Sequence, residues 1–191
     1  MKTFDADKIQ DAVQQLLVAL NQDLTDENLK DTPRRVAKYW MELLEGELYT
    51  NDEIAKMFDK QFALPTSNNM VVLTDIPLFS HCCHHLALMY NMKAHVAYIP
   101  KDKVIGLSKI PRIVDMVGKR LQLQERICED VVYIMQQILG TSSVAVVIEG
   151  EHGCVSARGI KKVGCATRTE VLDGDFKTNP SLCRRFYELI K

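Results

Sequence analysis

The sequence predicts an α+β fold in which helices come first and an antiparallel sheet follows. Apolar residues recur at helical spacing through residues 5–58, and runs of strand-forming residues begin near residue 70. The chain has 191 residues, of which 47% are hydrophobic, and can therefore bury one core. We expect an N-terminal helical region at residues 1–65 and a second domain at residues 66–191.

Helix-breaking and capping residues divide the first region into three expected helices. They are residues 5–20, a segment from a cap at Thr25 or Asp26 to a glycine stop near Gly46, and residues 51–58. Pro33 marks the start of the regular part of the second helix, because proline is tolerated in a first turn.

The second region is expected to contain both strands and helices. Strands are expected at residues 70–76, 86–99, 144–149 and 154–171, and helices at residues 107–117, 121–139 and 179–189. Because the strands come as two hairpin-like pairs, the sheet is expected to be antiparallel.

Charge and composition exclude several classes of partner. The formal net charge is −1 with a pI near 6.5, which does not favour binding to nucleic acid. No apolar run has membrane-spanning length, and the N-terminus lacks the order of a signal peptide. We therefore expect a cytoplasmic protein without a membrane partner. There, the six cysteines are expected to be free thiols or metal ligands.

A dense group of metal-binding residue types stands at residues 79–85, whose sequence is FSHCCHH. Cys82 and His85 have the Cys-x-x-His spacing that lets one turn offer two ligands to an ion. Such a pair alone is more often incidental or structural, and two ligands do not hold zinc. His152-Gly153-Cys154 is the other close His/Cys pair, so Cys154 could complete a three-ligand site with an open position for water, which is the catalytic pattern.

Several blocks of the chain resemble GTP cyclohydrolase I in order and spacing. They are Thr32–Lys38, Ser80–His85 followed by Val96–Pro100, Ile105–Arg112, Gln122–Arg126, Leu139–Thr141, and His152-x-Cys154 followed by Ala157-Arg158-Gly159. The resemblance implies a tunnelling fold (T-fold), in which the sheet units of several subunits close into a barrel. It also implies a homodecamer with active sites between subunits.

The resemblance further implies a reaction and its cofactor. Cys82, His85 and Cys154 would bind Zn²⁺, which activates water for attack at C8 of GTP. Formate is released, the ribose rearranges, and ring closure gives 7,8-dihydroneopterin triphosphate, the first step of folate- or tetrahydrobiopterin-type pterin biosynthesis.

The remaining matches assign roles to polar side chains. His152 would be the main proton carrier and His84 a supporting one, since imidazole titrates near working pH. Glu125 would accept the guanine N1–H and 2-amino protons, and Gln124 would line the same pocket. Cations and a hydroxyl would bind the triphosphate and ribose: Ser108, Lys109, Arg112, Arg158 and, from a neighbouring subunit, Arg35 and Lys38. Without the resemblance, Arg35 and Lys38 would be interpreted as a solvated helix face.

Cys83 stands where the family usually has Glu, and the strand 86–100 is one residue longer than usual, which predicts a β-bulge. The substitution leaves an alternative open: a protein that binds zinc and a purine nucleotide with slow, partial or no turnover. A nitrile-reducing deazaguanine enzyme on the same fold is disfavoured, because it would use a nucleophilic Cys without this metal set.

Overall fold

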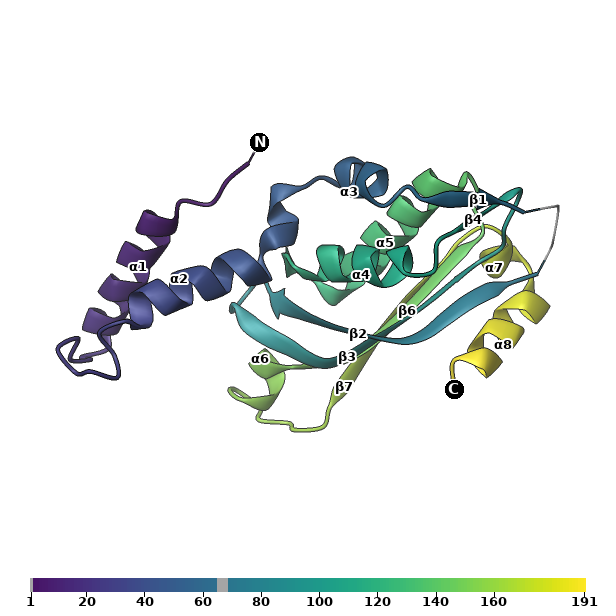
Figure 1. The fold of residues 1–191 in the computed structure, drawn as a ribbon. Coiled ribbons are helices and arrows are strands. Elements are labelled where there is room, and N and C mark those ends of the chain that lie inside the picture. Colours follow the sequence, from purple (N-terminus) through teal and green to yellow (C-terminus); the bar gives the residue numbers. More distant parts are fainter. Residues whose placement is uncertain (1, 65–68) are drawn as a thin grey trace.

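The computed structural model describes residues 2–64 and 69–191 (Figure 1). The helical elements are α1 (Ala6–Ala19), α2 (Thr32–Leu43), the 3₁₀ turn η1 (Glu45–Leu48), α3 (Asn51–Met57), α4 (Lys109–Gly118), α5 (Gln124–Leu139), α6 (Gly153–Ser156), α7 (Asp175–Thr178) and α8 (Pro180–Leu189). The strands are β1 (Gln61–Ala63), β2 (Val71–Cys82), β3 (Ala87–Tyr98), β4 (Lys103–Ile105), β5 (Leu121–Gln122), β6 (Val144–His152) and β7 (Ala166–Leu172). The predicted domain boundary falls at residues 65–66, outside the described residues, and stays a prediction.

A five-stranded sheet forms the centre of the fold and confirms the α+β prediction. Its strand order is β5-β2-β3-β6-β7, with the short β5 parallel to β2 and every other pair antiparallel. The two expected hairpins are β2–β3 and β6–β7, and β3 pairs with β6 to join them. β1 and β4 form a separate antiparallel pair that the sequence analysis did not anticipate.

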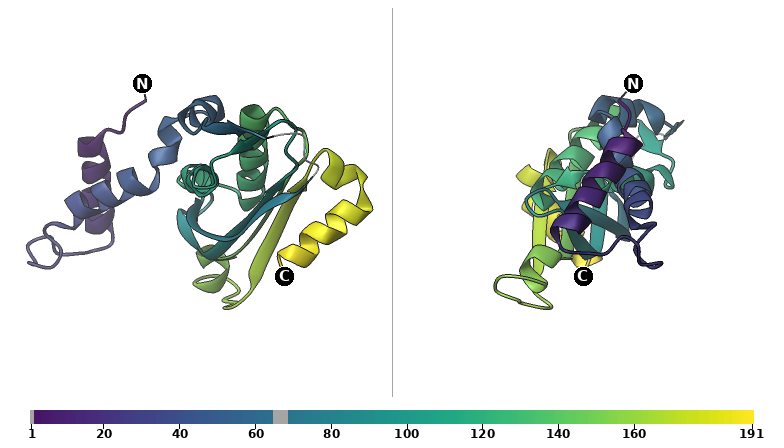
Figure 2. Two further views of the ribbon diagram at one scale, coloured as in Figure 1. Left: turned by 45° about the vertical axis from the view of Figure 1, so that its right-hand side comes forward. Right: turned by 90° about the vertical axis from the view of Figure 1, so that its left-hand side faces the viewer.

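Helices cover the two faces of this sheet unequally (Figures 1 and 2). α4 and α5 pack on one face, where Val96, Val146 and Ile148 belong to the main core. The opposite face carries Ala97 and Ala145, which form a smaller cluster with residues of α7 and α8. The alternation follows from the two-residue period of a strand, which sends successive side chains to opposite faces.

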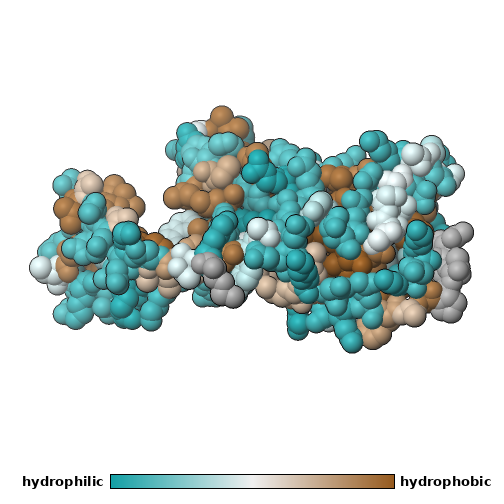
Figure 3. All heavy atoms as spheres, turned by 90° about the horizontal axis from the view of Figure 1, so that it is seen from above, coloured by the Kyte–Doolittle hydropathy of each residue, from teal (hydrophilic) through white to brown (hydrophobic). Residues whose placement is uncertain are grey.

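Helices α1 and α2 form an arm that stands off the sheet (Figures 1 and 2). α1 has no buried residue, and Leu16, Val18 and Leu20 are each more than half exposed. Apolar atoms reach the surface of this arm in Figure 3. The amphipathic pattern that predicts α1 is thus real, but within one chain its apolar side is only partly covered.

The second expected helix begins later and ends earlier than predicted. Residues 24–31 form turns in which Asp23 and Asp26 side chains accept backbone N–H groups, and α2 begins at Thr32 with Pro33 in its first turn. It ends at Leu43, so Gly46 is not its stop signal. Gly46 is required for packing instead, because an added Cβ would lie 2.0 Å from the Met116 carbonyl oxygen.

The expectation of one long strand at residues 154–171 was wrong, and so was a helix beginning at residue 121. Cys154 lies in the short helix α6, and the strand β7 begins only at Ala166. Leu121 extends the sheet as part of β5, and α5 begins at Gln124. The apolar alternation that suggested a strand includes Ile160 and Val163, which are exposed in a connecting loop.

The predicted bulge in the second strand of the hairpin is confirmed. The register of β3 shifts by one residue between Tyr90 and Lys93 against β6, and again in the same region against β2. Asn91 has a φ of 50°, a left-handed conformation that asparagine tolerates better than most residues. The bulge turns the Asn91 side chain toward β6, where it donates a hydrogen bond to Glu151.

Among the described residues, no helix combines the length and apolar character needed to cross a membrane.

Candidate active site

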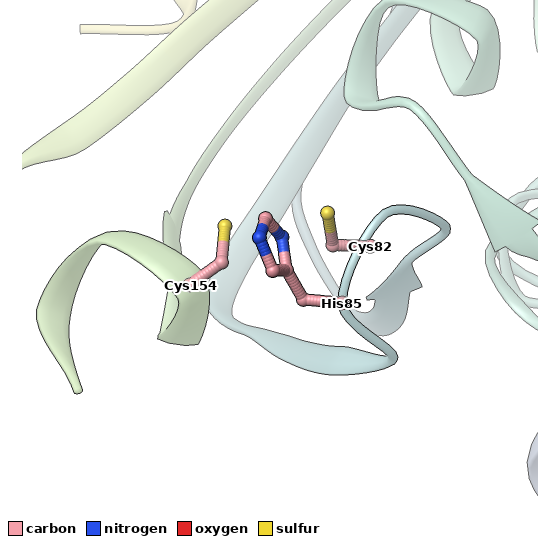
Figure 4. A group of neighbouring side chains, drawn as sticks. All are labelled: Cys82, His85 and Cys154. Carbon is pink, nitrogen blue, oxygen red and sulfur yellow. The ribbon is translucent and has the colours of Figure 1, made fainter. Parts of the chain in front are cut away.

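The three predicted metal ligands converge at the end of the sheet nearest the arm (Figures 1 and 4). Cys82 is the last residue of β2, His85 lies in the turn that follows, and Cys154 lies in α6. Their ligand atoms all lie within 4.8 Å of one another, and the His85 ring lies between the two sulfur atoms (Figure 4). Segments about seventy residues apart in sequence thus form one cluster.

The donor set fits a zinc ion. Ligand atoms at zinc distances of about 2.0–2.3 Å stand about 3.3–3.8 Å apart in a tetrahedron, and the three ligand atoms here all lie within 4.8 Å of one another. Two thiols and one imidazole are the ligand types that zinc prefers, and three protein ligands leave a fourth position free. Burial and the adjacent Cys82 thiol raise the pKa of Cys154 above its ordinary value, and a bound cation would oppose both effects by stabilising the thiolate.

Backbone contacts hold the turn and the helix that carry these ligands. Cys83 N–H donates to the Gln122 carbonyl oxygen, which attaches the turn to β5, and His85 N–H donates to the Cys82 carbonyl oxygen within the turn. α6 packs closely on β3, where an added Cβ at Gly153 would lie 3.0 Å from the Leu88 carbonyl oxygen. The cluster is therefore fixed by the sheet rather than by a long loop.

Arg158 and His84 flank the ligands. The Arg158 guanidinium donates from Nη1 to His85 Nε2 at 2.8 Å, so Nε2 holds the lone pair of the neutral ring, which is the lone pair that a bound ion would take instead. His84 is exposed, with its Nδ1 3.7 Å from Cys82 Sγ. Cys83 is also exposed.

His152, at the end of β6, is held by a buried glutamine. Gln124 is 1% exposed, and its Nε2 donates to the carbonyl oxygens of Ile148 and Thr167, each at 3.0 Å. Those bonds fix the orientation of the amide, so its Oε1, 2.8 Å from His152 Nε2, is an acceptor. His152 Nε2 therefore carries a proton, and in the neutral ring Nδ1 is the free base.

The electrostatic surroundings favour a neutral His152. Burial lowers its pKa below the ordinary histidine value, and the negative charge of Glu125 opposes that shift. Glu125 itself is exposed in the first turn of α5, next to Gln124. Glu125, Gln124 and His152 thus lie in one neighbourhood.

The predicted anion-binding residues lie at several places on the surface. Ser108 precedes α4 and makes no capping hydrogen bond with its side chain, and Lys109 and Arg112 follow in the first turns. Within the described part of the chain, Lys109, Arg112 and Lys38 make no side-chain ion pair, whereas Arg35 lies 3.6 Å from Asp31 of its own helix. Among the described residues, no side-chain hydrogen bond or ion pair joins Arg35 or Lys38 of the arm to a residue near the metal ligands.

One residue of the site region escaped the sequence analysis. His81 is 2% exposed, directly precedes Cys82, and packs edge-on against Trp40 of α2 with ring centroids 5.0 Å apart. Its Nε2 is 3.4 Å from the Tyr39 hydroxyl, and burial lowers its pKa. This contact attaches the arm to the strand that carries Cys82. The adjacent aromatic residues Tyr39 and Trp40, within a charged helix, were the sequence signal that could have indicated this contact.

Comparisons with known proteins give the family. The GTP cyclohydrolase I family profile matches residues 9–191. The chain is 52% identical to "GTP cyclohydrolase 1" of Clostridium botulinum (strain Kyoto / Type A2) over 190 residues, 97% of each chain. The chain belongs to the GTP cyclohydrolase I family.

Further relatives cover the chain equally well. The protein of the same name from Ruminiclostridium cellulolyticum is 52% identical over 194 residues, 99% of this chain and 100% of its own length. That from Clostridium beijerinckii is 51% identical over 186 residues, 95% and 94% of the two chains. The enzyme class predicted from the sequence motifs is thereby confirmed. The individual residue roles stay predictions.

Proposed function

We propose that this chain is a zinc-dependent enzyme that hydrolyses GTP at C8, releases formate and, after rearrangement of the ribose, forms 7,8-dihydroneopterin triphosphate. The observation that carries the proposal is the three-ligand cluster of Cys82, His85 and Cys154 beside an oriented, neutral His152, in a chain of this family. When bound, zinc would supply a Lewis acid that lowers the pKa of water toward neutrality.

His152 is the proposed base and acid. Its neutral form is favoured by burial, and its free Nδ1 can accept a proton at neutral pH. The Gln124 contact holds the ring in one tautomer, so no reorientation is needed between proton transfers. His84, exposed beside Cys82, is the proposed supporting proton carrier.

Substrate recognition is assigned to two groups of residues. Glu125 is the proposed acceptor of the guanine N1–H and 2-amino protons, because a carboxylate offers two acceptor oxygens side by side. The triphosphate is the proposed ligand of Lys109, Arg112 and Arg158. The N-terminus of α4 adds the positive end of its helix dipole, which favours a phosphate there.

Self-association completes the proposed site, with Arg35 and Lys38 reaching the triphosphate bound to a neighbouring subunit. The arm supports this assignment, because it stands off the sheet and carries exposed apolar residues that a second copy could cover. A barrel of T-fold units in a homodecamer is the proposed assembly, and the cytoplasm is the predicted location.

A second candidate is a homologue that binds zinc and a purine nucleotide but turns over slowly or not at all. The observation that favours it is Cys83, a neutral thiol at a position where the family usually has a carboxylate. Incubation of the zinc-loaded protein with GTP distinguishes the two. Formate and the fluorescent pterin in equal amounts support the enzyme, bound GTP with neither product supports the second candidate, and formate alone indicates a reaction that stops after ring opening.

A further inference from the structure

Glu151 precedes His152 in β6 and has no role in the site described above. The residue is half-buried while its carboxylate lies at the surface, and within the described residues it has no cationic partner. Neutral donors surround it instead. Oε1 accepts from Asn91 Nδ2 at 2.9 Å, and Oε2 accepts from the Gly164 N–H at 3.0 Å. The Tyr90 hydroxyl lies 3.2 Å from Oε2.

These donors come from two segments of the chain. Tyr90 and Asn91 belong to the bulge of β3, whereas Gly164 belongs to the exposed loop 157–165 between α6 and β7. The Tyr90 hydroxyl is also 2.9 Å from Ser156 Oγ, at the end of α6. The Glu151 carboxylate thus joins the bulge directly to the far end of the loop, and the Tyr90 hydroxyl links this group to α6.

The loop 157–165 carries Arg158 near its start, where the guanidinium donates to His85. Three of its residues, including Gly164, have positive φ. Within the loop, Lys161 N–H donates to the Arg158 carbonyl oxygen at 3.2 Å, and Lys162 N–H donates to the Val155 carbonyl oxygen of α6 at 3.1 Å. Without the Gly164 anchor, its second half would have no side-chain attachment to the sheet among the described residues. A loop of this kind samples many conformations unless contacts at both ends restrict it.

We propose that Glu151 is a positioning residue: its carboxylate fixes loop 157–165 and thereby holds the Arg158 guanidinium beside His85 for the triphosphate of the substrate. The inference rests on the proposed function for the role of Arg158 and deepens it. Only an ionised carboxylate suits the position, because two oxygens without hydrogen must face donors from both the bulge and the loop. Glutamine would keep the size but would turn an N–H group toward one of those donors.

The test compares Glu151→Gln with Glu149→Gln, a matched control on the same strand. The Glu149 carboxylate pairs with Arg168 of β7. Hydrogen exchange measured by mass spectrometry on the zinc-loaded protein reports on the loop whether or not GTP is turned over. We expect faster exchange in peptides covering residues 157–165 for Glu151→Gln alone, with unchanged zinc content. Unchanged exchange would overturn the proposal, and so would loss of zinc, which would make Glu151 a support of α6.

Kinetics then test the link to the triphosphate. Loss of a hydrogen bond to a charged group typically costs about tenfold or more in affinity, so KM for GTP should rise about tenfold in Glu151→Gln while kcat changes little. The inhibition constant of guanosine, which has no phosphate, should not change.

If Glu151 acts through Arg158, Glu151→Gln should add nothing to the effect of Arg158→Gln. Additive effects, or an equal loss of guanosine binding, would contradict the proposal. A wild-type protein that forms no product would count against the proposed function, while the exchange result would still stand.

Discussion

The two ends of the proposed substrate site differ in how complete they are within one chain. At the metal end, three ligand atoms lie within 4.8 Å, and a fully buried Gln124 orients His152. At the anion end, Lys109 and Arg112 make no ion pair in the described chain, and the cations of α2 lie on the projecting arm.

The difference has a physical basis. Proton transfer and metal binding need groups placed within about 0.5 Å, which only a packed framework provides. Attraction between a cation and a phosphate falls slowly with distance and tolerates flexible side chains. The metal end can therefore be built by one chain, whereas the anion end can be shared between chains.

Removing a ligand should have the largest effect and would affect the metal end alone. We expect Cys154→Ser to lose zinc and to reduce turnover about 1,000-fold or more, because two remaining ligands do not hold the ion. Metal analysis and formate release measure both. Cys183→Ser is the control, because Cys183 lies in α8, on the face of the sheet opposite to α4 and α5. This variant should keep both its zinc and its turnover. Full zinc content in Cys154→Ser would exclude Cys154 as a ligand.

Replacing Gln124 should show whether this residue orients His152 or lines the guanine pocket. Gln124→Met keeps the volume but leaves His152 without its acceptor, so we expect kcat to fall about 100-fold with zinc retained. If Gln124 instead acts by lining the guanine pocket, KM for GTP should rise and kcat should be unchanged. Steady-state kinetics at saturating and limiting GTP distinguish these outcomes.

Cys83→Glu should increase turnover by improving the metal end of the site. A carboxylate beside the two histidines would orient an imidazole better than a thiol, and such outer contacts are worth about 10–100-fold in activity. Because Cys83 is exposed, the added charge stays hydrated, and we expect the melting temperature to be unchanged. Unchanged kcat would mean that position 83 takes no part in the chemistry.

The smallest expected effect concerns the contact between arm and sheet. Burial lowers the pKa of His81, so the unfolded chain binds more protons than the folded chain below the ordinary histidine pKa near 6.5. Stability should therefore fall as pH drops below about 6.5 and be level above it. His81→Gln should reduce this acid sensitivity, by about a few degrees of melting temperature between pH 7 and pH 5. Identical pH profiles would show that His81 is not the titrating group.

Much of this arrangement follows from local sequence patterns. Most of the helices, the hairpins and the Cys82–His85 pair could be predicted, because periodicity and ligand spacing are short-range signals. The convergence of Cys154 on that pair is a long-range contact, and its prediction depended on the His152-x-Cys154 motif and the resemblance to the family. The Gln124–His152 contact could not, since it depends on how α5 packs against β6. Gly46 was misinterpreted for the same reason: the need for glycine comes from the distant Met116 backbone.

The connection from Cys154 to Ala166 was also mispredicted, because its apolar residues suggested a strand. Ile160 and Val163 are instead exposed within one chain. Periodicity predicts which residues share a face, but it does not say whether that face is covered by the same chain or by another.

Mixing two inactive variants tests most directly whether the site is shared between subunits. Cys154→Ser lacks the metal end but keeps the arm, and the double variant Arg35→Ala, Lys38→Ala lacks the arm cations but keeps the metal end. If each site takes its arm from a neighbour, random 1:1 hybrids restore roughly one quarter of the sites. Co-refolding the two variants should therefore recover formate release, whereas each variant refolded alone should remain inactive. Inactive mixtures, with hybrid assemblies verified by native mass spectrometry, would contradict a shared site.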